Sequence, residues 1–213
     1  MATKGASAAP AIKTSEAAAF RDRLRAGLQT IALRIIATEG LNELQARRVA
    51  VEAQCSVGTI YNIYGDLDGL IIAANADTLA LMDAALRRAY EATRTLPIVE
   101  RLTGLALAYM HFAYSNQKCW SAIFEHRLPA EKKLPEDYDR NRAQLLALLA
   151  QAIGDNAMPQ DKRMRAARAL FAATHGIIAL ALNNKLSPFD PATVEADIRF
   201  IVTAAAKGLA EVG

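Results

Sequence analysis

The side chains best suited to a chemical task lie in one stretch, residues 45–70, which reads QARRVAVEAQCSVGTIYNIYGDLDGL. This pattern predicts two short helices, Gln45 to Ala53 and Val57 to Tyr61, separated by a tight turn. Ser56 can cap the second helix, because its hydroxyl can accept a hydrogen bond from an otherwise unpaired first-turn amide. The second helix then presents hydroxyl and amide groups outward, a chemistry that suits the reading of base edges in a DNA groove.

Eight residues in this stretch are candidates for contact with a DNA duplex. The arginines of the first helix supply charge for phosphate groups, and the tyrosine of the second can donate a hydrogen bond to one. Gly58 costs about 1 kcal/mol relative to alanine inside a helix, and the close approach of a DNA strand would justify that cost. The predicted DNA-binding residues are Gln45, Arg47, Arg48, Val57, Gly58, Thr59, Tyr61 and Asn62.

Two longer helices must hold this stretch, since neither of its short helices is long enough to be stable alone. A preceding helix buries one face through apolar residues spaced three and four apart, and Gly40 is suited to end it. Asp66 can cap a following helix that extends towards Ala92. The residues expected to face inward are Val49, Ala50, Ala53, Cys55, Ile60 and Tyr64.

The same stretch resembles the DNA-binding module of the TetR family of regulators. The run VAVEAQCSVGTIYNIYGDLDGLI is similar to the family's pattern of isoleucine-alanine, a small turn, serine-x-glycine-threonine-leucine-tyrosine, an aromatic residue and a leucine. The resemblance also covers the preceding helix. It implies three helices that bind DNA, a fourth that links them to a helical body, and a body that dimerises. The matching residues are Val49, Ala50, Ala53, Ser56, Gly58, Thr59, Ile60, Tyr61, Tyr64 and Leu70.

Three residues depart from the family's pattern. Gln54 stands where a glycine is usual, so the turn must accommodate a side chain or a strained backbone. Ile63 and Leu67 stand where relatives carry a histidine and a lysine that touch phosphates, and each replacement removes one such contact. Basic residues nearer the N-terminus could compensate for these losses, namely Lys13, Arg21, Arg23 and Arg25.

The rest of the chain also reads as helical, so the predicted fold class is all-α. Breaks that contain Gly, Pro and Asn separate expected helices at 98–115, 118–127, 135–154, 161–184 and 190–211. The predicted organisation has four parts. These are a disordered tail over 1–15, a three-helix helix-turn-helix domain over 16–66, a linking helix over 67–96, and a helical-bundle domain for ligand binding and dimerisation over 97–213.

Aromatic and neighbouring residues of the body are candidates for lining an apolar ligand pocket. They are Tyr109, Met110, Phe112, Trp120, Phe124 and His175. Ordinary core packing explains the same residues, and the sequence leaves both interpretations open. His175 and Gly176 also resemble a tryptophan-histidine-glycine signature found in one branch of the family, with Thr174 in place of the tryptophan.

The last two expected helices carry apolar stripes that predict a homodimer. Two adjacent apolar helices at a chain end favour burial against a second copy, and the family resemblance implies a four-helix bundle there. A dimer also suits an operator with two half-sites. The candidate interface residues are Leu170, Ile177, Val194, Ile198, Ile201, Val202 and Ala205.

Composition and missing motifs exclude other classes of protein. The net charge of +3 is mild, and the two cysteines form no zinc pattern, so neither a metal nor a cofactor is expected. No HExxH, phosphate-binding loop or nucleophile elbow is present, which argues against an enzyme. Neither a secretory signal nor an apolar run of about 18 residues occurs, which predicts a cytoplasmic protein without a membrane partner.

These observations predict a DNA-binding transcriptional regulator, a repressor released from its double-stranded operator by a small-molecule effector. The alternative is a helical ligand-binding protein whose DNA-binding module has degenerated. The losses at Ile63 and Leu67 keep that alternative open.

Overall fold

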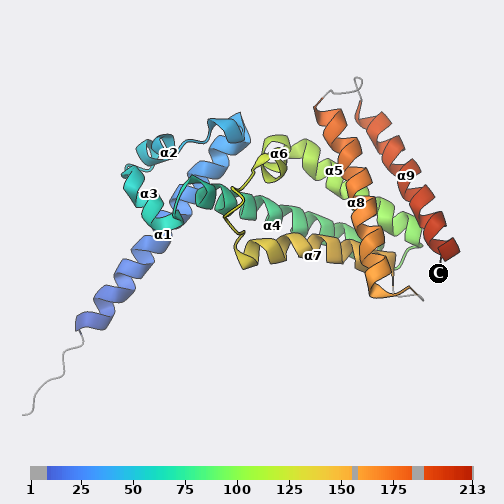
Figure 1. The fold of residues 1–213 in the computed structure, drawn as a ribbon, viewed down its shortest axis with the longest axis horizontal. Coiled ribbons are helices and arrows are strands. Elements are labelled where there is room, and N and C mark those ends of the chain that lie inside the picture. Colours follow the sequence, from blue (N-terminus) through green and yellow to red (C-terminus); the bar gives the residue numbers. More distant parts are fainter. Residues whose placement is uncertain (1–8, 155–157, 184–189, 213) are drawn as a thin grey trace, which may run out of the picture. The chain divides into compact units, whose positions relative to one another are not determined.

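The computed structural model describes residues 9–154, 158–183 and 190–212. Over these residues the fold is all-helical without strands, which confirms the predicted fold class (Figure 1). The chain divides into two compact units, one up to Ala74 and one from Asn75, and a single helix runs through the division. The helices are α1 (Ala9–Glu39), the 3₁₀ helix η1 (Leu41–Glu43), α2 (Ala46–Glu52), α3 (Val57–Tyr64), α4 (Leu67–Thr93), α5 (Ile98–Ser115), α6 (Gln117–Glu125), α7 (Glu136–Ile153), α8 (Gln160–Leu182) and α9 (Pro191–Val212).

The first helix is longer than the sequence predicts. It begins at Ala9, inside the stretch 1–15 for which a disordered tail is expected, whereas residues 1–8 lie outside the described part of the chain. Alanine has the highest helix propensity, and Pro10 suits a first turn because its missing N–H would have no helical partner there. At the other end, the N–H of Gly40 donates to the Ile36 carbonyl at 2.9 Å, as expected for a residue that ends the helix.

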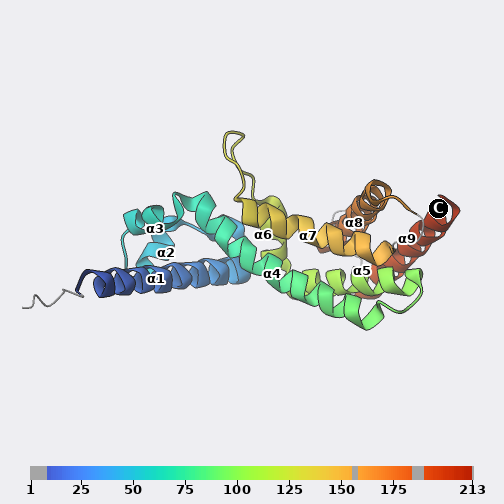
Figure 2. The same ribbon diagram turned by 90° about the horizontal axis from the view of Figure 1, so that it is seen from below.

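In the first unit, α2 and α3 lie against one side of α1 (Figure 2). Each of these helices contributes apolar side chains to one shared core, which explains how two short helices remain folded. The start of α4 closes this core. The buried residues include Leu28, Ala32, Ile35, Ile36, Val49, Ala50, Ile60 and Leu70.

In the second unit, α5 packs against α6, α7, α8 and α9, and α8 also packs against α7 and α9. The ends of these helices agree with the sequence-based predictions to within two residues. Pro97, Pro135 and Pro159 stand directly before helices, because a proline cannot donate a backbone hydrogen bond to a preceding turn. Asn116 stands between α5 and α6. The α6–α7 connection, residues 126–135, is a long loop without helix.

Among the residues that the structure describes, two helices are long and apolar enough in composition to cross a membrane, α4 and α8. In the 18-residue apolar stretch of each helix, half of the α4 stretch is buried inside the protein, but only 28% of the α8 stretch is. Core helices of water-soluble proteins meet the same criterion, so this is weak support for a membrane span. The low burial of α8 means that the described residues leave much of its apolar surface uncovered.

Candidate functional site

The outward face of α3 is held by hydrogen bonds at both of its ends. At the start, the Ser56 hydroxyl accepts from the Thr59 amide at 3.1 Å, which confirms the predicted cap. At the far end, the Tyr64 hydroxyl donates to the Arg25 carbonyl of α1 at 2.7 Å. The next helix begins in the same way, because Asp66 Oδ1 accepts from the Gly69 amide at 3.0 Å. Together these hydrogen bonds hold α3, a short helix, in place on its packed core.

Most of the predicted DNA-binding residues lie on the surface of this unit. Tyr61 is 45% exposed, Asn62 and Gly58 are exposed, and Ile60 between them is completely buried. Val57 and Thr59 are half-buried, and the Thr59 hydroxyl lies 2.9 Å from that of Ser56. On and just before α2, Gln45 and Arg47 are exposed. Whether they contact DNA remains a prediction.

Two glycines on either side of this face have different reasons to be glycine. A Cβ atom on Gly58 would meet only the Ser56 Oγ within 4 Å, at 3.6 Å, so the chain itself has room for a side chain there. A Cβ atom on Gly69 would lie 2.0 Å from the Tyr64 carbonyl oxygen, which no side chain can tolerate. The α3–α4 turn therefore requires Gly69, a requirement that the sequence analysis missed.

The turn between α2 and α3 carries the strain that the sequence predicts. Gln54 has φ of 52°, the left-handed region, and is alone in this among the described residues other than glycine. The Cys55 amide donates to the Ala50 carbonyl at 2.9 Å and holds the turn closed. A left-handed non-glycine residue costs about 1–2 kcal/mol, which the packed helices on both sides must outweigh.

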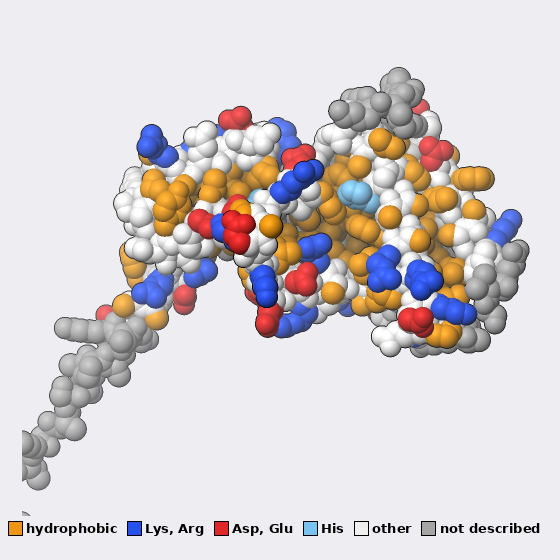
Figure 3. Space-filling view, in the orientation of Figure 1, with side chains coloured by type: hydrophobic (Ala, Val, Ile, Leu, Met, Phe, Trp, Pro, Cys, Tyr) orange, Lys and Arg blue, Asp and Glu red, His pale blue; other side chains and the backbone are white. Residues whose placement is uncertain are grey.

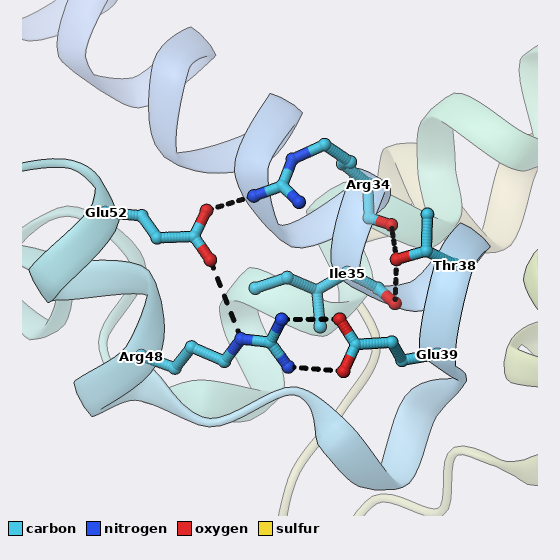
Figure 4. A network of polar contacts seen from close by, with 6 residues as sticks. All are labelled: Arg34, Ile35, Thr38, Glu39, Arg48 and Glu52. Atoms are coloured by element: carbon cyan, nitrogen blue, oxygen red, sulfur yellow. Dashed lines mark hydrogen bonds and ion pairs between the residues drawn. The ribbon is translucent and has the colours of Figure 1, made fainter.

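One predicted phosphate ligand, Arg48, is instead held by carboxylates of its own chain (Figure 4). Its guanidinium pairs with both oxygens of Glu39, with one distance of 2.7 Å, and its Nε lies 3.5 Å from Glu52. Glu52 also pairs with Arg34 of α1. The hydrogen bonding of the Arg48 guanidinium to the Glu39 carboxylate is the main cause that raises the pKa of Arg48. This network ties α2 to the end of α1, so Arg47 is the freer cation.

Arg25, which was expected to compensate for lost phosphate contacts, lies at the end of α3. Its guanidinium donates to the Ile63 carbonyl at 3.1 Å and lies 5.2 Å from the centre of the Tyr64 ring. Ile63 is the position at which the family resemblance implies a missing histidine. A positive charge therefore stands beside that position, although it belongs to α1. Arg25, Arg21 and Arg23 are all exposed, and the side chain of Lys13 lies outside the described residues.

The second unit contains a small apolar cavity of about 50 Å³. Residues of α4, α5, α7 and α8 line it, and Tyr109 and Thr174 are the polar residues among them. The lining consists of Met82, Leu86, Leu102, Leu105, Ala106, Tyr109, Leu145, Leu148, Leu149, Leu170, Phe171 and Thr174.

A cluster of aromatic rings stands beside this cavity. The Tyr109 hydroxyl accepts from Trp120 Nε1 at 3.0 Å and is hydrogen-bonded to His175 Nδ1 at 2.9 Å. The His175 ring centre lies 4.3 Å from that of Phe124 and 5.0 Å from that of Trp120. Burial lowers the pKa of His175 and strongly raises that of Tyr109, so both groups are neutral near pH 7. The cluster is a hydrogen-bonded, uncharged wall.

The structure thus brings together four of the six predicted pocket residues and separates two. Tyr109 lines the cavity, Trp120 and His175 stand behind it, and Phe124 lines an adjoining groove. Met110 and Phe112 are buried but line none of the described hollows, and are placed as ordinary core residues. The residues that the prediction missed are aliphatic, such as Leu145 and Leu149, and nothing in their spacing distinguishes them from core.

The predicted dimer residues also divide into two groups. Val194, Ile198 and Val202 are completely buried within the chain, where α9 packs on α5 and α8, so this part of the prediction is corrected to core. Ala205, Ile201 and Leu170 line a groove between α8 and α9 of about 400 Å³, and Ile177 is half-buried. Hydrophobic side chains are visible among charged ones over this region (Figure 3). Phe200 of α9 is 75% exposed.

The fold defines a class, a helix-turn-helix unit joined to a helical body, and comparison with known proteins shows which family and structures it resembles. Residues 102–205, just under half of the chain, match the model of the family described as tetracyclin repressor-like, C-terminal domain. No curated protein matches the chain. The predicted tryptophan-histidine-glycine branch stays a prediction.

Solved structures share the fold across nearly the whole chain. A protein of unknown function from Rhodococcus sp. RHA1 is 22% identical, with 87% of this chain and 94% of that chain covered and a TM-score of 0.69. A TetR-family transcriptional regulator from Streptomyces coelicolor is 17% identical, with coverages of 90% and 84% and a TM-score of 0.66. A TetR variant from Acinetobacter baumannii AYE in complex with minocycline is 14% identical, with coverages of 87% and 95% and a TM-score of 0.62. The chain therefore has the TetR-like fold.

Proposed function

We propose that this protein is a DNA-binding transcriptional regulator of the TetR family, a repressor that binds its operator as a homodimer. The observation that carries the proposal is the outward face of α3. Tyr61, Asn62 and Gly58 are exposed on a helix that Ser56 caps at its start, that Tyr64 ties to α1 at its end, and that buried Ile60 anchors. A rigid short helix with hydrogen-bonding side chains outward fits the major groove. The C-terminal family match and the TetR-like fold support the same function.

We place the dimer contact at the groove between α8 and α9. Its walls include small residues, Ala166, Ala169, Ala173 and Gly208, which would let helices of a second copy approach closely. Exposed Phe200 and Leu180 extend the apolar surface beyond the groove. Apolar surface of this kind favours burial against a partner, and two linked reading heads increase operator affinity. The dimer should therefore persist at micromolar concentration in light scattering.

An effector in the second unit would release the operator by moving α4. This helix lines the cavity through Met82 and Leu86 and continues into the DNA-binding unit, which ends at Ala74. Its packing is imperfect, because Asn75 Oδ1 and Asp83 Oδ1 are buried without a hydrogen-bond partner. A buried oxygen without a partner costs free energy, and a shift of α4 that gave these oxygens partners would recover that cost. Release requires the effector to bind that alternative state more tightly.

The experiment measures binding of the purified protein to the DNA that flanks its gene, at two salt concentrations and with random duplex as competitor. We expect specific retention that weakens steeply with salt, because phosphate contacts release counterions. The double variant Thr59→Ala, Tyr61→Ala should lose this binding. Thr30→Ala, which removes an exposed hydroxyl of α1 outside the proposed face, should retain it.

Two outcomes would contradict the proposal. Equal binding to the flanking and the random duplex would favour the alternative, a ligand-binding protein with a degenerate DNA module. Arg48, held by Glu39 and Glu52, is the observation that keeps this alternative in view. Unchanged binding by the double variant, with its fold verified by circular dichroism, would mean that α3 is not the reading helix.

A further inference from the structure

We propose that the second unit binds an anionic amphiphile, a slender apolar chain that carries a carboxylate or phosphate head group. The proposal deepens the proposed function, since it names the chemistry of the effector. Three adjoining hollows support the proposal, because the two ends of their series differ in polarity and charge. One end is apolar, and the other is more open and basic, so a single ligand that satisfies both must be apolar at one end and negatively charged at the other.

The three hollows form a continuous series because neighbours share lining residues. The apolar cavity of about 50 Å³ shares Met82, Leu145 and Phe171 with a groove of about 270 Å³. That groove in turn shares Ile123, Asp139 and Arg142 with an open hollow of about 570 Å³ beneath the α6–α7 loop. If the side chains of Met82, Leu145 and Phe171 moved, the cavity and the groove would join into one space, with Arg142 at its outer rim.

The apolar end selects for a neutral, slender group. None of its lining residues is charged, and the Tyr109 hydroxyl is already engaged by Trp120 and His175. A charge buried there would have no partner, and the free-energy cost would be large. The cavity is also smaller than the cavity of about 150 Å³ that holds a benzene ring in an engineered protein. The end of an extended chain fits such a space better than a ring does.

The open end selects for negative charge. Its lining holds Lys132, Lys133 and Arg142 against one carboxylate, Asp139, with His126 beside them. The ion pair between Arg142 and Asp139 is long, at 3.9 Å, and both side chains are more than half exposed. Such a pair is weak, so Arg142 can turn to a stronger partner. A guanidinium binds carboxylate or phosphate through two parallel hydrogen bonds.

Trp120 gives a direct readout of binding without DNA. It is the single tryptophan of the chain, is 2% exposed, and its ring centre lies 5.2 Å from that of Phe124, which lines the groove. The full chain is titrated, below the micelle concentration, with laurate, lauroyl-coenzyme A, coenzyme A alone and dodecanol. We expect laurate or lauroyl-coenzyme A to bind at least about tenfold more tightly than dodecanol, with the tighter of the two identifying the head group. Equal binding of dodecanol, or binding of coenzyme A alone with the same affinity, overturns the proposal.

A matched pair of variants tests the role of Arg142. Arg142→Gln should weaken binding of the preferred ligand about tenfold and leave dodecanol unchanged, whereas Arg140→Gln, exposed on the same helix outside the hollows, should change neither. Wild-type affinity of Arg142→Gln would overturn the assignment. A chain that binds DNA but no amphiphile refutes this inference alone. A chain that binds the amphiphile but no DNA refutes the proposed function alone.

Discussion

The two units of this protein carry their candidate functional groups in opposite places. In the first unit these groups point outward, with Tyr61 and Asn62 exposed over a core that is fully closed around Ile60. In the second unit they point inward, with Tyr109, Trp120 and Thr174 buried beside a cavity. A reading surface needs a rigid support, whereas a sensor needs an interior that a ligand can enter. The two units therefore differ in how completely they are packed.

This difference predicts how each unit responds to a change of side-chain volume. The α3–α4 turn of the first unit has no space at Gly69, and one methyl group would collide with backbone. The second unit holds a cavity of about 50 Å³ and an adjoining groove, so some of its side chains can move. Substitutions that add equal volume should then destabilise the first unit strongly and the second unit only slightly.

Gly69→Ala should produce the largest effect and would sharpen this contrast. The added Cβ would stand 2.0 Å from the Tyr64 carbonyl oxygen, so α3 or the start of α4 must shift. We expect the free energy of unfolding to fall by about 3 kcal/mol and DNA binding to be lost. Thermal unfolding followed by circular dichroism measures the first quantity, and retention of duplex DNA measures the second.

Gly58→Ala is the matched control, since its Cβ meets nothing closer than 3.6 Å. Alanine should raise stability by about 1 kcal/mol through helix propensity and yet weaken DNA binding, because the methyl group occupies the approach to the duplex. If Gly58→Ala keeps full affinity, the glycine has no role at the interface. If Gly69→Ala keeps full stability, the turn is not the rigid support described above.

The first unit was largely predictable from the sequence because its determinants are local. Ser56 and Asp66 stand at helix starts, and Gly40 stands at a helix end, where a single residue type decides the backbone. Gly69 and the pairing of Arg48 were missed, because both depend on atoms that approach from another segment. The spacing of residues places a side chain on a face, but it does not show which partner will meet it there.

A second test asks which arginine of α2 contacts DNA and which one stabilises the fold of the first unit. Arg47→Gln should reduce the slope of log affinity against log salt by about one, because one phosphate contact is lost. Arg48→Gln should leave that slope unchanged, since its guanidinium is held by Glu39 and Glu52. Binding isotherms at several salt concentrations give both slopes. A reduced slope for Arg48→Gln alone would show that the ion pairs open on DNA and that the two arginines have exchanged roles.

The function of the second unit was less predictable, for a physical reason. A side chain that lines a cavity and one that fills a core can share the same spacing on a helix, as Tyr109 and Phe112 of α5 show, three residues apart. The same ambiguity affected α9, where Val194 and Ile198 turn inward and Phe200 outward. The type of side chain indicated a role where polarity mattered, at His175. Unfilled volume, in contrast, arises only when the whole molecule is packed, so residue types do not predict it.

The smallest effect that we predict concerns pH, and it addresses the second unit alone because all three histidines lie beyond Asn75. Burial lowers the pKa of His175 below the unfolded value of about 6.5. The unfolded chain therefore binds a proton more readily than the folded chain. Stability should fall as the pH decreases through and below about 6.5, and not as it rises. Protonation at Nδ1 would also remove the acceptor of the Tyr109 hydroxyl.

His175→Phe tests this in a site that already holds aromatic rings. Denaturant unfolding followed by Trp120 fluorescence between pH 5 and pH 8 should show that the variant loses part of the acid-dependent decrease in stability. His111→Gln, an exposed histidine of α5, should keep the decrease. An unchanged pH profile in His175→Phe would mean that the wall of the cavity accepts a charge at little cost. That result would remove the contrast between the units and count against the exclusion of charged groups from the apolar end of the ligand site.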